Sequence, residues 1–299
     1  MSFLRLLSEL RSPALDWIML GISHIGTPYF VTACILIIYL CVNKKAGWGM
    51  FFALLFASLP AQGLKLIFRV PRPWNLDNTF VPVSAAVQSA GGYSFPSIHS
   101  QSAASLATTL SLYYKKTKAR TFFCLLMVLV LFSRMYLGCH TPSDVAAGAA
   151  IGIVISLIVF RSFTKGADSE KNDGLWIFFL TAFTAIVLFL AGAFLWNGTV
   201  DFLNAKDSLD TAGLSLGLTA AFILERRRLK FSAEGTLKEK LLRSLVSAGG
   251  GLLLLQVLHV LPDQSAASDV TRYAVAAFWM AGIAPAILIK CGLLRKEEA

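Results

Sequence analysis

Charged side chains are scarce in this sequence. Asp, Glu, Lys and Arg together make up 15% of its 299 residues, whereas a soluble domain averages about 25%. Apolar residues make up 56% of the chain, and the mean hydropathy is +0.66. This balance excludes an intrinsically disordered protein, which needs high charge and low hydrophobicity. It also disfavours a soluble globular fold, because too much apolar surface would face water.

Disulfide-forming and zinc-binding patterns are lacking as well. The five cysteines include no CxxC pair, and four of them lie in apolar runs. A free thiol in such a run behaves as a small hydrophobic group. The sequence therefore predicts neither a disulfide framework nor a zinc site.

Long apolar runs are what the sequence has instead. A membrane-spanning helix needs roughly 20 apolar residues, and the runs predict an all-α fold, a polytopic bundle of about nine transmembrane helices. Residues 1–25 are amphipathic and are expected to lie in the membrane interface, and they lack the basic start, apolar core and cleavage site expected of a cleavable signal peptide. The predicted spans are 28–43, 46–64, 97–114, 121–138, 144–161, 175–196, 209–224, 244–262 and 270–291.

Basic residues are concentrated in every second loop between these spans. Because they collect in cytoplasmic loops, the pattern predicts that the N-terminus lies outside and the C-terminus in the cytoplasm. The net charge of +10 is thereby explained without nucleic-acid binding, which a basic soluble protein would suggest. Most of the 27 basic residues are in these loops: Lys44, Lys45, Lys115, Lys116, Lys118, Arg120, Arg161, Lys165, Lys171, Arg226, Arg227, Arg228, Lys230, Lys238, Lys240, Arg243, Arg295 and Lys296.

A polar stretch at 162–174 divides the chain and is interpreted as a cytoplasmic linker. Residues 1–161 would comprise the interfacial helix and a five-helix core, and 175–299 a four-helix membrane region of unknown role. Pairs of glycines spaced four apart occur in both parts, and this small-xxx-small spacing is typical of close helix crossings. They are Gly148 and Gly152, and Gly213 and Gly217.

Three cations lie on the side where basic residues are otherwise rare. Lys65, Arg69 and Arg72 are spaced i, i+4 and i+7 at the end of the second span, so we expect them on one helical face. Asp77 is the one acidic candidate nearby. Such a cluster suits an anion, and phosphate is the natural one. The alternative is three snorkelling side chains at a helix end.

The segment Pro96-Ser97-Ile98-His99 enters the third span and suits a helix start. The backbone N–H groups of Ser97 and Ile98 would then be free to bind an anion, as at other helix N-termini. His99 would face the same anion from the first turn. A simple helix cap with an interfacial histidine is the alternative.

A third polar group lies at the same side, at the end of the fourth span. Arg134 stands in apolar sequence, where a buried arginine is costly without an anionic partner. His140 and Asp144 are four apart and could meet at a helix start, so that the carboxylate fixes the imidazole tautomer. One motif histidine could attack phosphorus while the other protonates the leaving oxygen.

At these residues the sequence resembles the type 2 phosphatidic acid phosphatase superfamily of integral-membrane lipid phosphate phosphatases. Its motifs are Lys-x6-Arg-Pro, Pro-Ser-Gly-His and Ser-Arg-x5-His-x3-Asp, and the resemblance covers roughly 14–161. Lys65 and Arg72-Pro73 match the first motif, and the third is matched in full from Ser133 to Asp144. The second motif has Ile98 where glycine is usual.

The resemblance implies a role for each matched residue. His140 would be the nucleophile that forms a phosphohistidine, Asp144 would orient it, and His99 would be the general acid. Phosphate binding would fall to Lys65, Arg72, Ser97, Ile98 and Arg134. The family implies no metal and no cofactor.

The isoleucine at position 98, where the second motif usually has glycine, has two possible consequences. If glycine serves a positive φ at this position, isoleucine would be strained. If glycine only leaves room for phosphate, isoleucine narrows the pocket while its N–H is retained. Either way we expect a reduced rate or an altered substrate range, which Ile98→Gly would test.

The function predicted is hydrolysis of a lipid phosphate or diphosphate at the extracytoplasmic face of a bacterial inner membrane. The alternatives are a lipid phosphotransferase that uses the same site, and a non-catalytic lipid-binding or transport protein. Vanadate-dependent haloperoxidases share the phosphate-site motifs but are soluble, and the spans argue against them. The expected partners are the lipid substrate and the bilayer, and homo-oligomerisation is left open.

Overall fold

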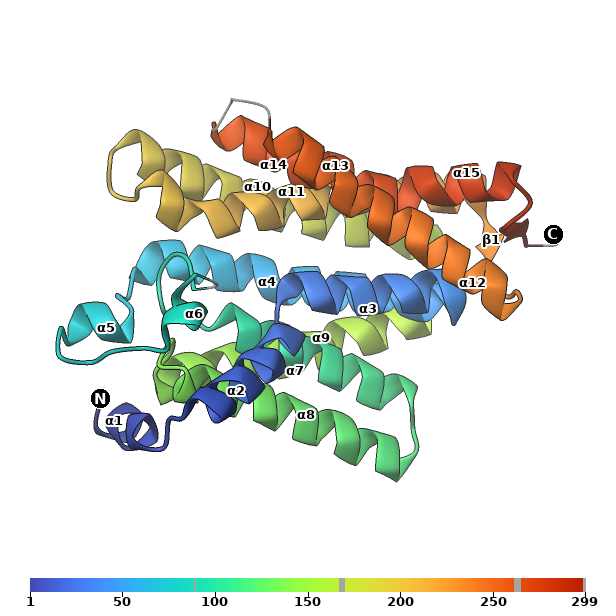
Figure 1. Cartoon of the computed structure of the whole chain (residues 1–299). Helices are drawn as coiled ribbons and strands as arrows, with labels where there is room; N and C mark the ends of the chain where they lie inside the picture. The colour runs from blue at the N-terminus through green and yellow to red at the C-terminus, as the bar shows by residue number, and fades with distance from the viewer. Residues whose placement is uncertain (89, 167–169, 261–264, 298–299) are drawn as a thin grey trace.

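The computed structural model describes residues 1–88, 90–166, 170–260 and 265–297. These residues form an all-helical bundle whose long helices run side by side (Figure 1). Strand structure in the described part is one antiparallel pair of two-residue strands, which joins Phe231 to Lys296 and Ser232 to Arg295. The elements of the first half are α1 (Ser2–Glu9), α2 (Pro13–Ile25), α3 (Pro28–Cys41), α4 (Lys44–Phe68), α5 (Pro73–Leu76), α6 (Ser84–Val87), α7 (Ile98–Tyr113), α8 (Thr117–Tyr136) and α9 (Pro142–Gly166).

The second half is built in the same way. It comprises α10 (Glu170–Trp196), α11 (Phe202–Leu224), β1 (Phe231–Ser232), α12 (Leu237–Ser244), α13 (Gly250–His259), α14 (Ala266–Phe278), α15 (Ala284–Lys290) and β2 (Arg295–Lys296). π-Helical turns at Leu245–Gly249 and Trp279–Ile283 join α12 to α13 and α14 to α15. Each pair therefore runs as one long helix.

Six helical segments in the described part are long and apolar enough to cross a membrane. The bent pair α2 and α3, which meet at 50°, could supply a seventh. Each of the nine predicted spans overlaps a helix in the described residues, but three of these helices, α3, α7 and α11, do not qualify as membrane spans by themselves, and α3 does so only together with α2. α7 has only 16 residues, and α11 opens with the charged residues Lys206, Asp207 and Asp210. The six segments are Lys44–Leu76, Thr117–Tyr136, Pro142–Lys165, Asn172–Trp196, Leu237–His259 and Ala266–Lys290.

The segment predicted to lie in the interface forms two helices. α1 is amphipathic and buries Leu4 and Leu7. α2 is capped by the Ser12 hydroxyl and continues into the bent pair with α3. Its inner surface also reaches the candidate site, as described below.

Helix replaces most of the predicted linker. α9 continues to Gly166 and α10 begins at Glu170, so 162–166 and 170–174 are helical. Residues 167–169 of that linker lie outside the described part. The division of the chain into 1–161 and 175–299 stays a prediction.

α4 is the central helix, and both halves pack against it. Aromatic side chains from both halves meet around it in one hydrophobic core. Trp48 and Phe52 of α4 both make edge-on ring contacts with Phe222 of α11, at centroid distances of 5.0 Å. Phe52 also stacks on Phe163 of α9, at 5.0 Å. The first half and the second half of the chain therefore share one hydrophobic core.

Both predicted glycine pairs lie at helix crossings. A Cβ on Gly148 would come within 2.3 Å of the Ser97 carbonyl oxygen, and one on Gly152 within 2.4 Å of that of Gln101. α9 thus lies against α7 at backbone distance. Gly213 and Gly217 do the same for α11 against α14, where the nearest atoms are the carbonyl oxygens of Val270 and Ala274.

The two ends of the bundle differ in charge. The C-terminus, β1 and the start of α12 lie at one end, and the N-terminus, α5 and α6 lie at the other (Figure 1). At the C-terminal end Lys44 pairs with the buried Glu225 at 2.8 Å and with Glu297 at 2.9 Å. The basic loops therefore surround the end of the bundle opposite to α5 and α6.

Candidate active site

The first motif is positioned by the end of α4. The helix stops at Phe68 because Arg69 takes a left-handed conformation, with φ at 48°. Arg72 follows as the N-cap of α5. The expectation of one helical face for Lys65, Arg69 and Arg72 is therefore wrong, since the spacing was counted through a helix that ends. Arg69 instead lies over the ring of Phe194, 5.5 Å from its centroid.

Arg72 is held in place by backbone carbonyls. Its side chain donates to the carbonyl oxygens of Gly91 at 2.6 Å, Gly92 at 3.1 Å and Cys139 at 3.1 Å. Nη1 also lies 2.8 Å from Nε2 of His140. Only 4% of Arg72 is exposed, and two chain segments, 91–92 and 139–140, fix this cation beside the candidate nucleophile.

His140 and Asp144 meet as the sequence predicted. His140 Nδ1 lies 3.7 Å from Asp144 Oδ2, and both side chains are buried. Oδ2 also accepts hydrogen bonds from the Ser94 hydroxyl at 2.6 Å and from the Thr141 backbone N–H at 2.8 Å. The Ser94 hydroxyl is 3.4 Å from His140 Nδ1. Ser94 therefore lies between acid and imidazole, and the sequence analysis missed it, although it is only two residues before Pro96.

The surroundings of His140 favour the neutral imidazole. Burial lowers the pKa of His140 well below its usual value, and the charges of Arg72, Arg134 and Lys65 lower it further. With Nδ1 facing Ser94 and Asp144, the natural tautomer carries its proton there. Nε2 then keeps its lone pair and accepts the Arg72 N–H.

Arg134 is the least satisfied of the buried cations. It is 0% exposed, and one terminal nitrogen donates to the Ser23 hydroxyl of α2 at 2.7 Å. Nε and Nη2 are buried without a hydrogen-bond partner in the described part of the chain. Buried polar groups are nearly always paired, so this guanidinium is suited to an anion that is brought to it. Ser23 was not foreseen, because α2 lies more than a hundred residues away.

The second motif forms the start of α7. Ser97 is the N-cap, and its hydroxyl accepts from the Ser100 N–H and hydroxyl. Its own N–H donates to the carbonyl oxygen of Asp144 at 3.0 Å. The predicted phosphate contact through the Ser97 N–H is therefore not available in this arrangement. The bond instead ties the second motif to the third.

Ile98 is the first helical residue of α7. Its φ is not positive. Of the two hypotheses for the isoleucine at this position, backbone strain is therefore excluded, and only a narrower phosphate pocket is consistent with the structure. Both Ile98 and His99 line a cavity, and His99 Nε2 is buried there without a hydrogen-bond partner among the described residues.

This cavity brings most of the predicted site together. Its volume is about 540 Å3, and its walls include Lys65, Arg72, Ile98, His99 and His140. Ser97, Arg134 and Asp144 are not part of this lining. Lys65 is buried, and its nearest acidic atom is Asp207 Oδ2 at 4.0 Å.

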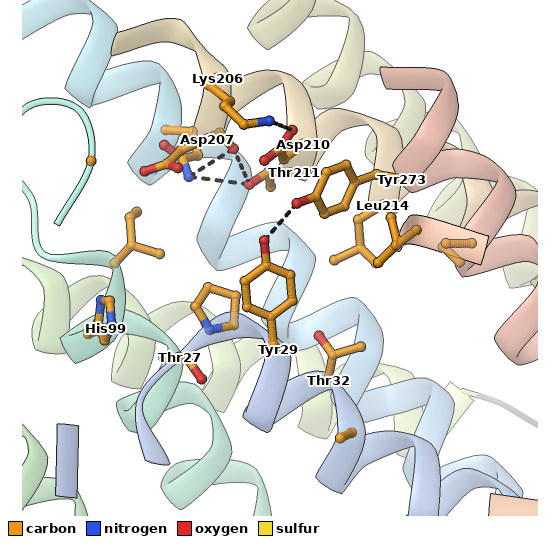
Figure 2. A pocket seen from close by; sticks show the side chains of 18 of the residues that line it. Thr27, Tyr29, Thr32, His99, Lys206, Asp207, Asp210, Thr211, Leu214 and Tyr273 are labelled. Carbon is orange, nitrogen blue, oxygen red and sulfur yellow. Dashed lines mark hydrogen bonds and ion pairs between the residues drawn. The ribbon is translucent and has the colours of Figure 1, made fainter. Parts of the chain in front are cut away.

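The opposite wall of the cavity comes from elsewhere in the chain. It is formed by α3, α11, α13 and α14 (Figure 2). The sequence analysis assigned no role to the C-terminal helices, because their polar residues match no motif. Among the described residues, no group of three or more His, Cys, Asp or Glu side chains is arranged to hold a metal ion.

The helices and the site together define a class, the integral-membrane phosphatases. Two family models match the chain, the PAP2 superfamily at 46–167 and the PAP2 superfamily phosphatase, transmembrane extension, at 209–297. The chain belongs to the PAP2 superfamily, whose type 2 phosphatidic acid phosphatases its motifs resemble, and it is an integral membrane protein.

Relatives of known activity match about half of the chain. Phosphatidylglycerophosphatase B of Bacillus subtilis (strain 168) is 28% identical over 172 residues, which cover 54% of this chain and 79% of the relative. Undecaprenyl-diphosphatase of Sulfolobus acidocaldarius is 29% identical over 168 residues, 54% of this chain and 77% of the relative. The crystal structure of Aquifex aeolicus LpxE is 26% identical and covers 54% of this chain and 93% of its own, with a TM-score of 0.47.

Proposed function

We propose that this protein hydrolyses a lipid phosphate or diphosphate through a phosphohistidine on His140, without a metal ion and on the extracytoplasmic side. The observation that carries the proposal is the shared cavity, which holds His140, His99, Lys65 and Arg72 against one another. Phosphatase relatives that act on different lipid phosphates support the reaction class.

The first step is attack on phosphorus by Nε2 of His140. Asp144 and Ser94 hold Nδ1, so that the imidazole is oriented and its positive charge is stabilised as the bond forms. The N–H that Arg72 now donates to Nε2 would move to a phosphoryl oxygen. Lys65 and the unpaired edge of Arg134 would add to this charge clamp.

His99 is positioned for proton transfer. It lines the cavity, and its Nε2 is buried without a hydrogen-bond partner among the residues that the structure describes. As general acid it would protonate the leaving oxygen of the lipid alcohol or phosphate. It would then accept a proton from the water that cleaves the phosphohistidine and returns His140 to its free form.

The side of the membrane follows from charge. The cavity lies toward the end that carries α5 and α6, while the basic loops surround the other end. If basic loops face the cytoplasm, the site opens outside it. A bacterial inner membrane is the host we propose.

The test is phosphate release by the detergent-purified protein from a panel of lipid phosphates. We expect His140→Ala to lower the rate by about 1,000-fold or more, as removal of a catalytic nucleophile does. His24→Ala is the matched control, because His24 lies at the end of α2, outside the cavity wall. Wild-type activity should persist in excess chelator. Equal rates for wild type and His140→Ala would refute the mechanism.

A further inference from the structure

The cavity has a second polar region, which the proposed reaction does not use. It is formed by Tyr29, Lys206, Asp207, Asp210 and Tyr273, and we call these five residues the polar collar. All of them line the cavity that holds His99 and His140 (Figure 2). Four of the five come from α11 and α14, so the C-terminal half supplies most of the collar.

A short hydrogen-bond chain runs through the collar. The hydroxyls of Tyr29 and Tyr273 are 2.6 Å apart, and the Asp210 carboxylate interacts with Tyr273 beside them. Tyr29 belongs to α3 and Tyr273 to α14, so the pair joins these two helices in the cavity lining (Figure 2). A chain of two phenols and a carboxylate can both donate to and accept from an inserted group.

The charges around the collar are balanced. Lys206 Nζ lies 3.4 Å from Asp210 and 2.9 Å from Asp269, and Asp269 is paired with Arg272 at 3.0 Å. Asp207 faces Lys65 of the phosphate site. A cationic headgroup would therefore meet no surplus of carboxylate. A neutral hydroxyl would find both a donor and an acceptor.

Beyond the collar the cavity becomes apolar. Its walls there include Leu36 of α3, Leu214 of α11, Leu252 and Leu255 of α13 and Met280. The same cavity thus passes from buried cations, with the unpaired Nε2 of His99 among them, through a hydroxyl-rich collar to a hydrocarbon-like end. That order matches an amphiphile whose phosphate is separated from its tail by a short polar linker.

We propose that the C-terminal half selects the substrate: the collar hydrogen bonds a free hydroxyl on the alcohol that bears the phosphate, and the apolar end holds the lipid tail. This proposal rests on the proposed phosphatase function. A lipid that places only carbon against Tyr273 and Asp210 would bury their polar groups without replacing their contacts with water, which is costly. Glycerol-type headgroups fit the collar, and a prenyl chain joined directly to diphosphate does not.

The decisive comparison uses two substrates that differ by one hydroxyl. They are phosphatidylglycerol phosphate and its deoxy analogue, in which propanediol replaces the headgroup glycerol. We expect wild-type kcat/KM to favour the hydroxylated lipid by about tenfold, the value of one good hydrogen bond. Tyr273→Phe and Asp210→Asn should bring this ratio close to one.

The control is Tyr114→Phe, since Tyr114 lies just beyond α7 and outside the cavity wall; it should keep the wild-type ratio. The same two lipids are also titrated onto His140→Ala, which reports binding without turnover. If wild type releases no phosphate but His140→Ala still prefers the hydroxylated lipid, the reaction is refuted and the selection stands. The proposed selection is overturned if wild type has equal kcat/KM for the two lipids. It is also overturned if Tyr273→Phe and Asp210→Asn lower kcat/KM equally for both lipids.

The tail is tested on adjacent leucines of α13. Both are more than half exposed, at 53% and 64%, but Leu252 lines the cavity and Leu253 does not. Leu252→Trp should raise KM about tenfold for a dioleoyl lipid and leave a dihexanoyl lipid unaffected, while Leu253→Trp should leave both unchanged. If Leu252→Trp raises KM for both chain lengths, or for neither, the lipid tail does not lie in this part of the cavity.

Discussion

Both halves of the chain bury an arginine, but the two side chains are treated differently. Arg243 of α12 is 1% exposed and donates to the carbonyl oxygens of Leu293, Leu40 and Ala233. Arg134 of α8 is 0% exposed, yet its Nε and Nη2 have no partner among the described residues. The paired arginine joins chain segments, whereas the other has two nitrogens without a partner in the described part of the chain, where the proposed function places an anion.

The same contrast extends to the glycine crossings. In both halves two glycines let one helix lie on the backbone of another. At Gly148 the approached backbone is Ser97, two residues before His99, whereas at Gly217 it is Ala274 in the cavity-forming α14. The same kind of helix crossing thus lies beside a candidate catalytic residue in one half and beside the cavity wall in the other.

The largest effect should separate the two arginines. Arg134→Lys removes the planar guanidinium and leaves a single point charge, so we expect phosphate release to fall by about 100-fold or more with little change in stability. Arg243→Lys breaks hydrogen bonds to backbone carbonyls and should lower the free energy of unfolding by about 1–3 kcal/mol. Its rate per folded molecule should be unchanged. Rates and thermal unfolding of both variants decide this, and an inactive, fully folded Arg243→Lys would break the comparison.

A smaller effect should separate the two glycine crossings. Gly148→Ala places a Cβ against the Ser97 carbonyl oxygen, which displaces the start of α7 and with it His99. A shift of about 1 Å can cost about 100-fold in rate. Gly217→Ala pushes α11 from α14 by a similar amount, so both should lose about 1–3 kcal/mol of stability.

Only Gly148→Ala should lose turnover of a short-chain lipid phosphate, measured as kcat on protein shown by its unfolding curve to be folded. If Gly217→Ala lowers that kcat equally, the C-terminal half takes part in the chemistry and the division of roles fails.

The smallest effect tests Ser23, which supports the phosphate site from outside the PAP2 match at 46–167. Ser23→Ala leaves Arg134 without its one side-chain partner, so we expect kcat/KM to fall by about tenfold. Inhibition by inorganic phosphate should weaken by a similar factor, and Ser23→Thr should restore both. Ser8→Ala, a change at an exposed hydroxyl of α1, is the control. A loss of stability with unchanged phosphate inhibition would show that Ser23 has only a packing role.

Sequence reasoning predicted the helices well and their number as membrane spans less well. Apolar runs mark every long helix, but a run does not show whether the helix is long enough to cross. α7 ends after 16 residues, and α11 begins with three charged residues that line the cavity. The end of α4 was not predicted either, so Lys65, Arg69 and Arg72 were wrongly expected on one helical face. The left-handed conformation of Arg69, which ends the helix, cannot be recognised from its residue type.

The sequence by itself determined the helical class, the alternation of basic loops and the residues of the three motifs. These depend on local composition and on short spacings, such as the four residues that join His140 to Asp144. Only the tertiary structure decided which N–H groups are already occupied, that Ser23 and Ser94 support the site, and that α11 and α14 close the cavity. Such contacts join positions as far apart as 244 residues, as for Tyr29 and Tyr273, and no local pattern encodes them, because they depend on how the helices pack around α4.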